Sequence, residues 1–160
     1  MDLWQKHLVI VPICVNFHWT VGVIHLDIDS DAPVEHNTIE ILDPIYPRRK
    51  EGRQMQDLVS RRKSTVIKKY LQAEFKDKKG RPMTKDMVNS YKFSYPTIPY
   101  QSNECDCGVF SLMYAFAACH QMEYTRFKKI HAKPFRKHIL ASVMAGKVLD
   151  IIRYPDIKLN

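Results

Sequence analysis

Short stretches in the first part of the chain are hydrophobic or alternate between hydrophobic and polar residues, which predicts β-strands. They run from His7 to Ile13, from Trp19 to about Ile28, and from Thr38 to Leu42. Cys14–Phe17 connects the first two, and the polar stretch Asp29–Asn37 separates the second from the third. The second stretch has apolar or small residues in both alternating sets, so we expect both of its faces to be buried. The short connections indicate an antiparallel meander.

From Met55 onward the period changes, because hydrophobic residues then recur at steps of three and four and predict one amphipathic helix. This helix is expected to end between Lys76 and Pro82. Its expected buried stripe consists of Met55, Leu58, Val59, Val66, Ile67, Tyr70, Leu71 and Phe75. Its expected outer face carries Arg61, Arg62, Lys63, Lys68 and Lys69.

The second half of the chain predicts a half-exposed strand and two helices. Tyr91, Phe93 and Tyr95 alternate with polar residues, as in a strand. A central helix follows, with an expected buried set of Val109, Phe110, Leu112, Met113, Tyr114, Phe116 and Ala117. A last helix is expected to start near Pro134 and to continue to Tyr154. Together these elements predict an α+β fold, in which a small and mostly antiparallel sheet packs against helices.

The length and composition of the chain limit the class of protein to which it can belong. A chain of 160 residues that is 45% hydrophobic predicts a single domain over residues 1–160, without internal repeats. Pro12 interrupts the apolar run near the N-terminus, so we expect neither a signal peptide nor a membrane span. Four cysteines without secretory context predict reduced thiols in the nucleus or cytoplasm. We expect a monomer.

The formal net charge of +8 is concentrated in one segment. Between Arg48 and Arg81 there are thirteen Lys or Arg residues and four acidic ones. Such a face can bind nucleic acid, an anionic membrane or an acidic protein, or can be a solvated helix surface. No stacking motif accompanies it, which disfavours specific nucleic-acid binding. The cysteines lack paired C-x-x-C spacing, which disfavours a zinc site.

The polar stretch Gln101–Gly108 ends where the apolar run Val109–Ala118 begins, and this places Cys107 at a helix N-terminus. Unpaired backbone N–H groups and the positive end of the helix dipole favour a thiolate over a thiol there. Cys107 is therefore a candidate nucleophile, and it requires a base, a group that orients the base, and donors for an oxyanion.

Seven histidines compete for the role of base, and position separates them. His18 lies just before the second strand, where its side chain can face a cleft at a sheet edge. Asp43 ends the third strand, and in a meander it would lie near His18 and accept the other imidazole N–H. Asp43 before Pro44 also fits a simple turn residue, so both interpretations stay open. Gln101 is a candidate oxyanion donor beside the backbone N–H of Cys107.

The candidate residues occur in an order that resembles a known family. His18-Trp19 follows the strand Val9–Ile13, Asp43 ends a strand, and Gln101-x-Asn103-x-x-Asp106-Cys107-Gly108 opens a helix. This set, from about His7 to Leu149, resembles the SUMO-specific cysteine proteases of the Ulp/sentrin-specific protease family.

The resemblance implies a papain-like fold and cleavage after the C-terminal Gly-Gly of SUMO or a related ubiquitin-like modifier, with that modifier and its conjugates as partners. It makes Cys107 the nucleophile, His18 the base, Asp43 the orienting carboxylate and Gln101 the oxyanion donor. It also places Trp19 over a narrow tunnel that admits only glycines. No cofactor or metal is implied.

The chain departs from the family pattern in two places. Glu104-Cys105 stands where the family has a glycine after the asparagine, and Cys105 is open to interpretation as a spectator, a metal ligand or a redox partner. Family domains also carry an N-terminal segment ahead of the first strand, whereas here only Met1–Lys6 precede it. These departures keep open a second hypothesis, a catalytically weak modifier-binding module derived from such a protease.

Overall fold

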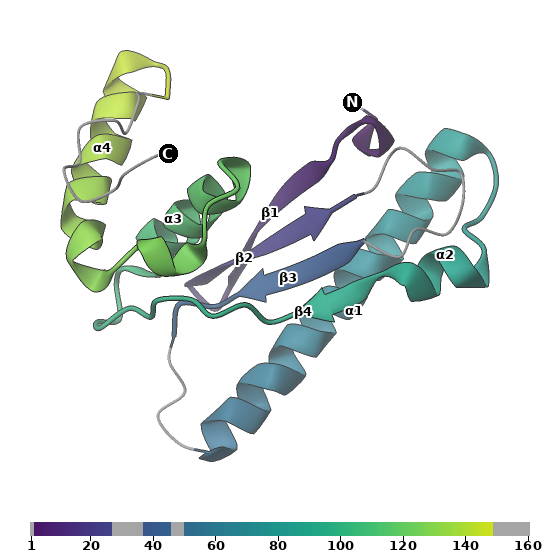
Figure 1. Ribbon diagram of the computed structural model, residues 1–160, viewed down its shortest axis with the longest axis horizontal. Helices are drawn as coiled ribbons and strands as arrows, with labels where there is room; N and C mark the ends of the chain where they lie inside the picture. The colour runs from purple at the N-terminus through teal and green to yellow at the C-terminus, as the bar shows by residue number, and fades with distance from the viewer. Residues whose placement is uncertain (1, 27–36, 46–49, 149–160) are drawn as a thin grey trace.

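The computed structural model describes residues 2–26, 37–45 and 50–148. In chain order the elements are a 3₁₀ turn η1 (Leu3–Gln5), β1 (Leu8–Val15), β2 (His18–His25), β3 (Thr38–Leu42), α1 (Lys50–Lys79), α2 (Lys85–Ser90), β4 (Lys92–Ser94), α3 (Cys107–Cys119), the 3₁₀ turns η2 (Tyr124–Arg126) and η3 (Lys129–His131), and α4 (Ala132–Ala145). The helices and the sheet confirm the predicted α+β class (Figure 1).

The strands form one sheet in the order β1-β2-β3-β4. The first three pair in an antiparallel meander, as predicted, and β4 joins β3 in parallel. In this register Val15 faces His18 across the hairpin, and Val21 faces Leu42 between β2 and β3. The start of β2 therefore lies beside the end of β3.

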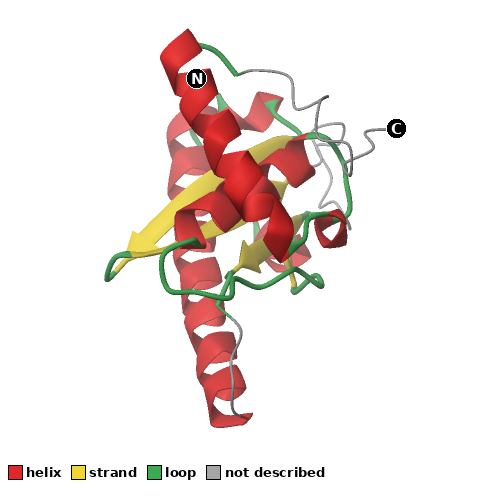
Figure 2. Ribbon diagram, turned by 90° about the vertical axis from the view of Figure 1, so that its left-hand side faces the viewer, coloured by secondary structure: helices red, strands yellow, loops and turns green. Residues whose placement is uncertain are grey.

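The central strand β2 is covered on both faces, with α1 on one side of the sheet and α3 and α4 on the other (Figures 1 and 2). Every residue from Thr20 to Ile24 is buried, as the sequence predicted. Val21 and Val23 pack into the core around α3, whereas Ile24 packs into a second core that includes α1. Because successive side chains of β2 point to opposite faces of the sheet, the strand contributes to both hydrophobic cores.

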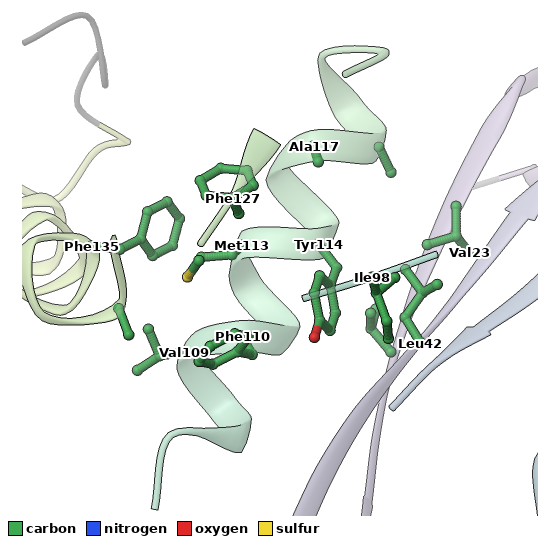
Figure 3. Packing of buried hydrophobic residues seen from close by; sticks show 13 residues of the cluster. Val23, Leu42, Ile98, Val109, Phe110, Met113, Tyr114, Ala117, Phe127 and Phe135 are labelled. Atoms are coloured by element: carbon green, nitrogen blue, oxygen red, sulfur yellow. The ribbon is translucent and has the colours of Figure 1, made fainter. Parts of the chain in front are cut away.

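The larger core surrounds α3, from which Phe110, Met113 and Tyr114 project toward different neighbours (Figure 3). Phe127 and Phe135 close it on the α4 side, with ring centroids 5.8 Å apart in an edge-to-face contact. Most of the predicted buried residues of this helix are confirmed, including all three named above. Leu112 is an exception, since its side chain is 49% exposed.

Helix α1 packs on the sheet through Ile67 and Leu71, and Ser60, Ser64 and Phe75 of the same helix are also buried. The predicted stripe was wrong for three residues, since Val59 is exposed, Val66 is 66% exposed and Tyr70 is 55% exposed. The side chains of Met55 and Leu58 lie outside the described residues. Two serines thus replace large residues in the contact and let the helix approach the strands.

Lys63 was predicted on the outer face of α1, and this prediction was wrong. Its side chain is only 13% exposed and points toward the sheet. It follows the buried Ser60 by three residues and precedes the buried Ser64, so it lies at the edge of the inward stripe. A long aliphatic stem can be buried there while the ammonium reaches a polar partner.

Several element boundaries differ from the prediction. The hairpin turn is only Asn16 and Phe17, at φ angles of 51° and 61°, so Cys14 and Val15 belong to β1 rather than to the connection. The short helix α2, capped by Thr84, was not predicted. Helix α4 ends at Ala145, because Gly146 adopts a left-handed φ of 63° and caps it. Residues 27–36 and 149–160, which include part of the predicted loop and of the last helix, lie outside the described residues.

Gly22 is required where α1 crosses β2. A Cβ at this position would lie 2.9 Å from Ile67 Cδ1 and 3.6 Å from Val11 Cβ. We predict that Gly22→Val lowers the free energy of unfolding by about 1–3 kcal/mol, because extra atoms must enter a packed core. Urea denaturation measures this change.

Two further variants show whether the contact with Ile67 is the cause. Ile67→Ala in the Gly22→Val background should lose less stability than the two single changes together, because it makes room for the new side chain. Val66→Ala on the exposed side should change stability by less than about 0.5 kcal/mol. Additive losses in the double variant would contradict this account.

Candidate active site

The hairpin and the β2–β3 register bring His18 and Asp43 together. His18 is the first residue of β2, and Asp43 directly follows β3. Their side chains form a hydrogen bond of 2.8 Å between His18 Nε2 and Asp43 Oδ1. Both are largely shielded, with side-chain exposures of 25% and 12%. The expected proximity of the two residues is therefore present in the structure.

This hydrogen bond assigns the two nitrogens of the imidazole. With a carboxylate as acceptor, Nε2 carries the proton, and in the neutral ring Nδ1 then holds the lone pair. Asp43 Oδ1 also accepts a 3.0 Å bond from the backbone N–H of Ile45, so Asp43 serves the turn as well as the histidine. His18 is thus oriented to accept a proton at Nδ1.

Cys107 is the first residue of α3, as predicted, and it is 7% exposed. Asp106 precedes it at the N-cap position but makes no side-chain capping bond. Its carboxylate instead accepts a 2.7 Å bond from Asn103 Nδ2 on one oxygen and pairs with Arg136 of α4 on the other. The backbone N–H groups of the first turn of α3 therefore lack a side-chain cap and favour a negative charge beside them.

Asn103 organises the loop before the cysteine. Its Oδ1 accepts from the backbone N–H groups of Cys105 and Asp106, at 3.1 and 3.0 Å. Its carbonyl oxygen accepts a 2.5 Å bond from Gln101 Nε2. The same loop is tied to the Asp43 region, because the backbone N–H of Gln101 donates to the carbonyl of Pro44 at 2.8 Å.

These contacts use only part of the hydrogen-bonding capacity of the Gln101 side chain. One hydrogen of Nε2 is committed to Asn103, and a primary amide carries a second one. The carbonyl oxygen Oε1 is buried without a hydrogen-bond partner among the described residues. Gln101 can therefore still donate one hydrogen bond near the start of α3.

Trp19 lies against the first turn of α3. A Cβ added to Gly108 would be 3.6 Å from Trp19 Cδ1 and 3.9 Å from Cγ, so the indole covers the backbone next to Cys107. Trp19 is still 42% exposed. In the described part of the chain no hydrogen bond joins Cys107 to His18. The five predicted site residues nevertheless form one neighbourhood: Trp19 and His18 are adjacent, and Gln101 is bonded to the residue after Asp43.

Lys63 also belongs to this neighbourhood, although sequence reasoning placed it on a solvated surface. Its Nζ lies 3.8 Å from Asp43 Oδ2 and donates a 3.0 Å hydrogen bond to Thr20 Oγ1. Burial lowers the pKa of Lys63, and the charge of Asp43 acts in the opposite direction. The only signal in the sequence was its position between two serines on the helix.

The remaining cysteines are distributed over the surface. Cys14, Cys105 and Cys119 are exposed, and all four thiols are free. The described residues contain no group of three or more His, Cys, Asp or Glu side chains placed to hold a metal ion. The helices within the described ranges include none long and apolar enough to cross a membrane.

The loop geometry predicts that Asn103 protects two amides from hydrogen exchange. Asn103→Ala removes the acceptor of the N–H groups of Cys105 and Asp106, each worth about 0.5–1.5 kcal/mol. Their exchange, measured by NMR, should accelerate roughly 2- to 10-fold. Ser102→Ala, an exposed change in the same loop, should leave both rates unchanged. Equal acceleration in both variants would show that the loop is not held by Asn103.

Comparisons with known proteins show which family this chain is similar to. Residues 1–145 match the family model described as the Ulp1 protease family, C-terminal catalytic domain. A sentrin-specific protease of Caenorhabditis elegans is 26% identical over 153 residues, which are 95% of this chain and 19% of that protein. The Ulp1-like SUMO protease catalytic domain of Chaetomium thermophilum superposes with a TM-score of 0.62 at 19% identity, covering 97% of this chain and 52% of that one.

The solved structure confirms the predicted fold. The chain spans about half the length of that domain and about a fifth of the C. elegans protein. The family match covers residues 1–145, and the description of the family as a protease family agrees with the class expected from the sequence. By this match, the chain belongs to the Ulp1 protease family, and the matched part of that family is its C-terminal catalytic domain.

Proposed function

We propose that this chain is a cysteine protease that cleaves after the C-terminal Gly-Gly of SUMO or a related ubiquitin-like modifier, through a Cys107–His18–Asp43 triad. The observation that carries the proposal is the 2.8 Å bond from His18 Nε2 to Asp43 Oδ1, next to the helix that begins with Cys107. An oriented base near a thiol at a helix N-terminus is the arrangement that cysteine nucleophiles require.

The first half of the reaction forms a thioester. His18 Nδ1 takes the proton of the Cys107 thiol, and the thiolate attacks the carbonyl carbon of the last glycine of the modifier. The oxyanion that develops accepts hydrogen bonds from the backbone N–H of Cys107 and from the second hydrogen of Gln101 Nε2. The C–N bond then breaks, and the amine leaves with the proton from the His18 imidazolium.

The second half releases the modifier. His18 is then neutral again and removes a proton from water, whose oxygen attacks the thioester carbonyl. Collapse of this second tetrahedral intermediate expels the Cys107 thiolate and leaves a free carboxyl group on the modifier. Throughout, Asp43 keeps the imidazole in one orientation and stabilises its charged form.

Trp19 supports the choice of a glycine C-terminus. The indole lies over the backbone at Gly108, so we infer that a substrate reaches the nucleophile through a narrow space beside it. Residues without side chains can enter such a space in an extended conformation and hold the scissile carbonyl close to Cys107. Four free thiols suit a reducing compartment, so we place the reaction in the nucleus or the cytoplasm.

A panel of vinyl-sulfone probes made from SUMO and other ubiquitin-like modifiers tests this function directly. We expect the SUMO probe to form a covalent adduct, visible as a gel shift, at Cys107 and not at the exposed Cys105. Cys107→Ser should abolish the adduct, whereas Cys105→Ser should leave it. Peptide mass spectrometry identifies the labelled sulfur.

Other outcomes of this experiment are equally informative. An adduct on Cys105 would mean that the wrong sulfur is assigned. An adduct with a different modifier would support the proposed chemistry but identify that modifier, rather than SUMO, as the substrate. SUMO binding without an adduct or any turnover would identify the chain as a catalytically weak binding module.

Variants of the triad separate the roles of its members. His18→Ala should remove nearly all turnover of a SUMO substrate. Asp43→Asn should lower kcat by up to about 10⁴-fold, because an amide does not fix the imidazole as a carboxylate does. Gln101→Ala should lower kcat by about 10²- to 10³-fold and leave KM nearly unchanged. A change in KM alone would make Gln101 a substrate contact rather than an oxyanion donor.

A further inference from the structure

The carboxylate of Asp43 has two oxygens, and they face different partners. Oδ1 accepts from His18 Nε2 and from the backbone N–H of Ile45. Oδ2 lies 3.8 Å from the ammonium of Lys63, whose side chain is 13% exposed. A largely shielded cation thus lies behind the carboxylate of Asp43.

Lys63 is itself held in place from the sheet. Its Nζ donates a 3.0 Å hydrogen bond to Oγ1 of Thr20, a residue with no exposed surface. The strand register places Thr20 one residue before the Val21–Leu42 pair and Asp43 one residue after it, so both neighbour the same point on α1. Helix α1, β2 and the end of β3 therefore meet at one ammonium group.

We propose that Lys63 is a positioning residue for the triad, which holds Asp43 through Oδ2 so that Oδ1 faces His18. This inference rests on the proposed function, in which Asp43 orients the base. An ammonium behind the carboxylate restricts its rotation, and a carboxylate fixed in this way, which only accepts hydrogen bonds, keeps the proton on His18 Nε2. Among the described residues Lys63 forms no hydrogen bond or ion pair with Cys107 or Trp19, so we infer that it acts through Asp43.

Kinetics distinguishes positioning from a general structural role. Lys63→Met keeps the length of the side chain and its helix propensity but removes the charge. We expect kcat to fall roughly 10- to 100-fold, the loss typical when a supporting partner of a functional side chain is removed, and KM to stay nearly constant. Lys63→Arg retains a cation and should recover most of the lost kcat. The matched control Lys69→Met, on an exposed part of the same helix, should keep the kcat of the unmodified protein.

A double-mutant cycle shows whether Lys63 acts through Asp43. In the Asp43→Asn background, Lys63→Met should lower kcat by less than about 3-fold, because the carboxylate to be positioned is already gone. The same fall in both backgrounds would overturn the proposal. If Lys63→Met does not fold, Thr20→Val replaces it: this change removes the acceptor that holds the ammonium and should also lower kcat without raising KM.

A second readout does not depend on turnover. In the Cys107→Ser protein labelled with ¹⁵N-histidine, the Nε2-bound proton of His18 should give an NMR signal protected by Asp43, identified by its absence in a His18→Gln variant. Lys63→Met should broaden this signal or speed its exchange, and Lys69→Met should not.

The two readouts separate failure of the inference from failure of the proposed function. If the unmodified protein cleaves no modifier but Lys63→Met loses the His18 signal, the proposed function is contradicted and the positioning role is supported. An unchanged signal together with an unchanged kcat in Lys63→Met would overturn the positioning role.

Discussion

The burial of β2 on both faces is the constraint on which the site depends. A strand covered by α1 on one side and α3 on the other offers no exposed face for chemistry, and its two histidines, His18 and His25, lie at its ends. His18 occupies the end that lies beside the start of α3 and the end of β3. The same packing that makes the core therefore fixes where a base, a nucleophile and a carboxylate can meet.

A carboxylate at that place has to be satisfied, because a buried charge without partners is costly. Asp43 accepts hydrogen bonds from His18 and from a backbone N–H, and it forms an ion pair with Lys63. The ammonium of Lys63 in turn donates a hydrogen bond to Thr20. Gly22 and the serines of α1 let the helix come close enough for Lys63 to reach across. The close helix–sheet contact thus contributes to the electrostatics of the site as well as to the core.

The sequence predicted best where local signals coincide. The change from polar turn residues to an apolar run marked Cys107, and short strands with tight connections placed Asp43 near His18. It failed where tertiary contacts decide. The rotation of α1 about its axis is set by the close approach at Gly22. This rotation exposes the hydrophobic Val66 and shields the charged Lys63, the reverse of what their hydrophobicity predicts. The catalytic roles of Cys107, His18, Asp43 and Gln101 stay predictions.

The start of α3 shows how the site uses a helix terminus that lacks its usual cap. An aspartate at the N-cap normally accepts from the first-turn amides, and losing that cap costs about 1 kcal/mol. In this chain Asn103 and Arg136 draw the carboxylate of Asp106 sideways, so those amides stay available. The proposed oxyanion would need the same donors, so the uncapped terminus leaves room for negative charge next to Cys107, at a small cost in stability.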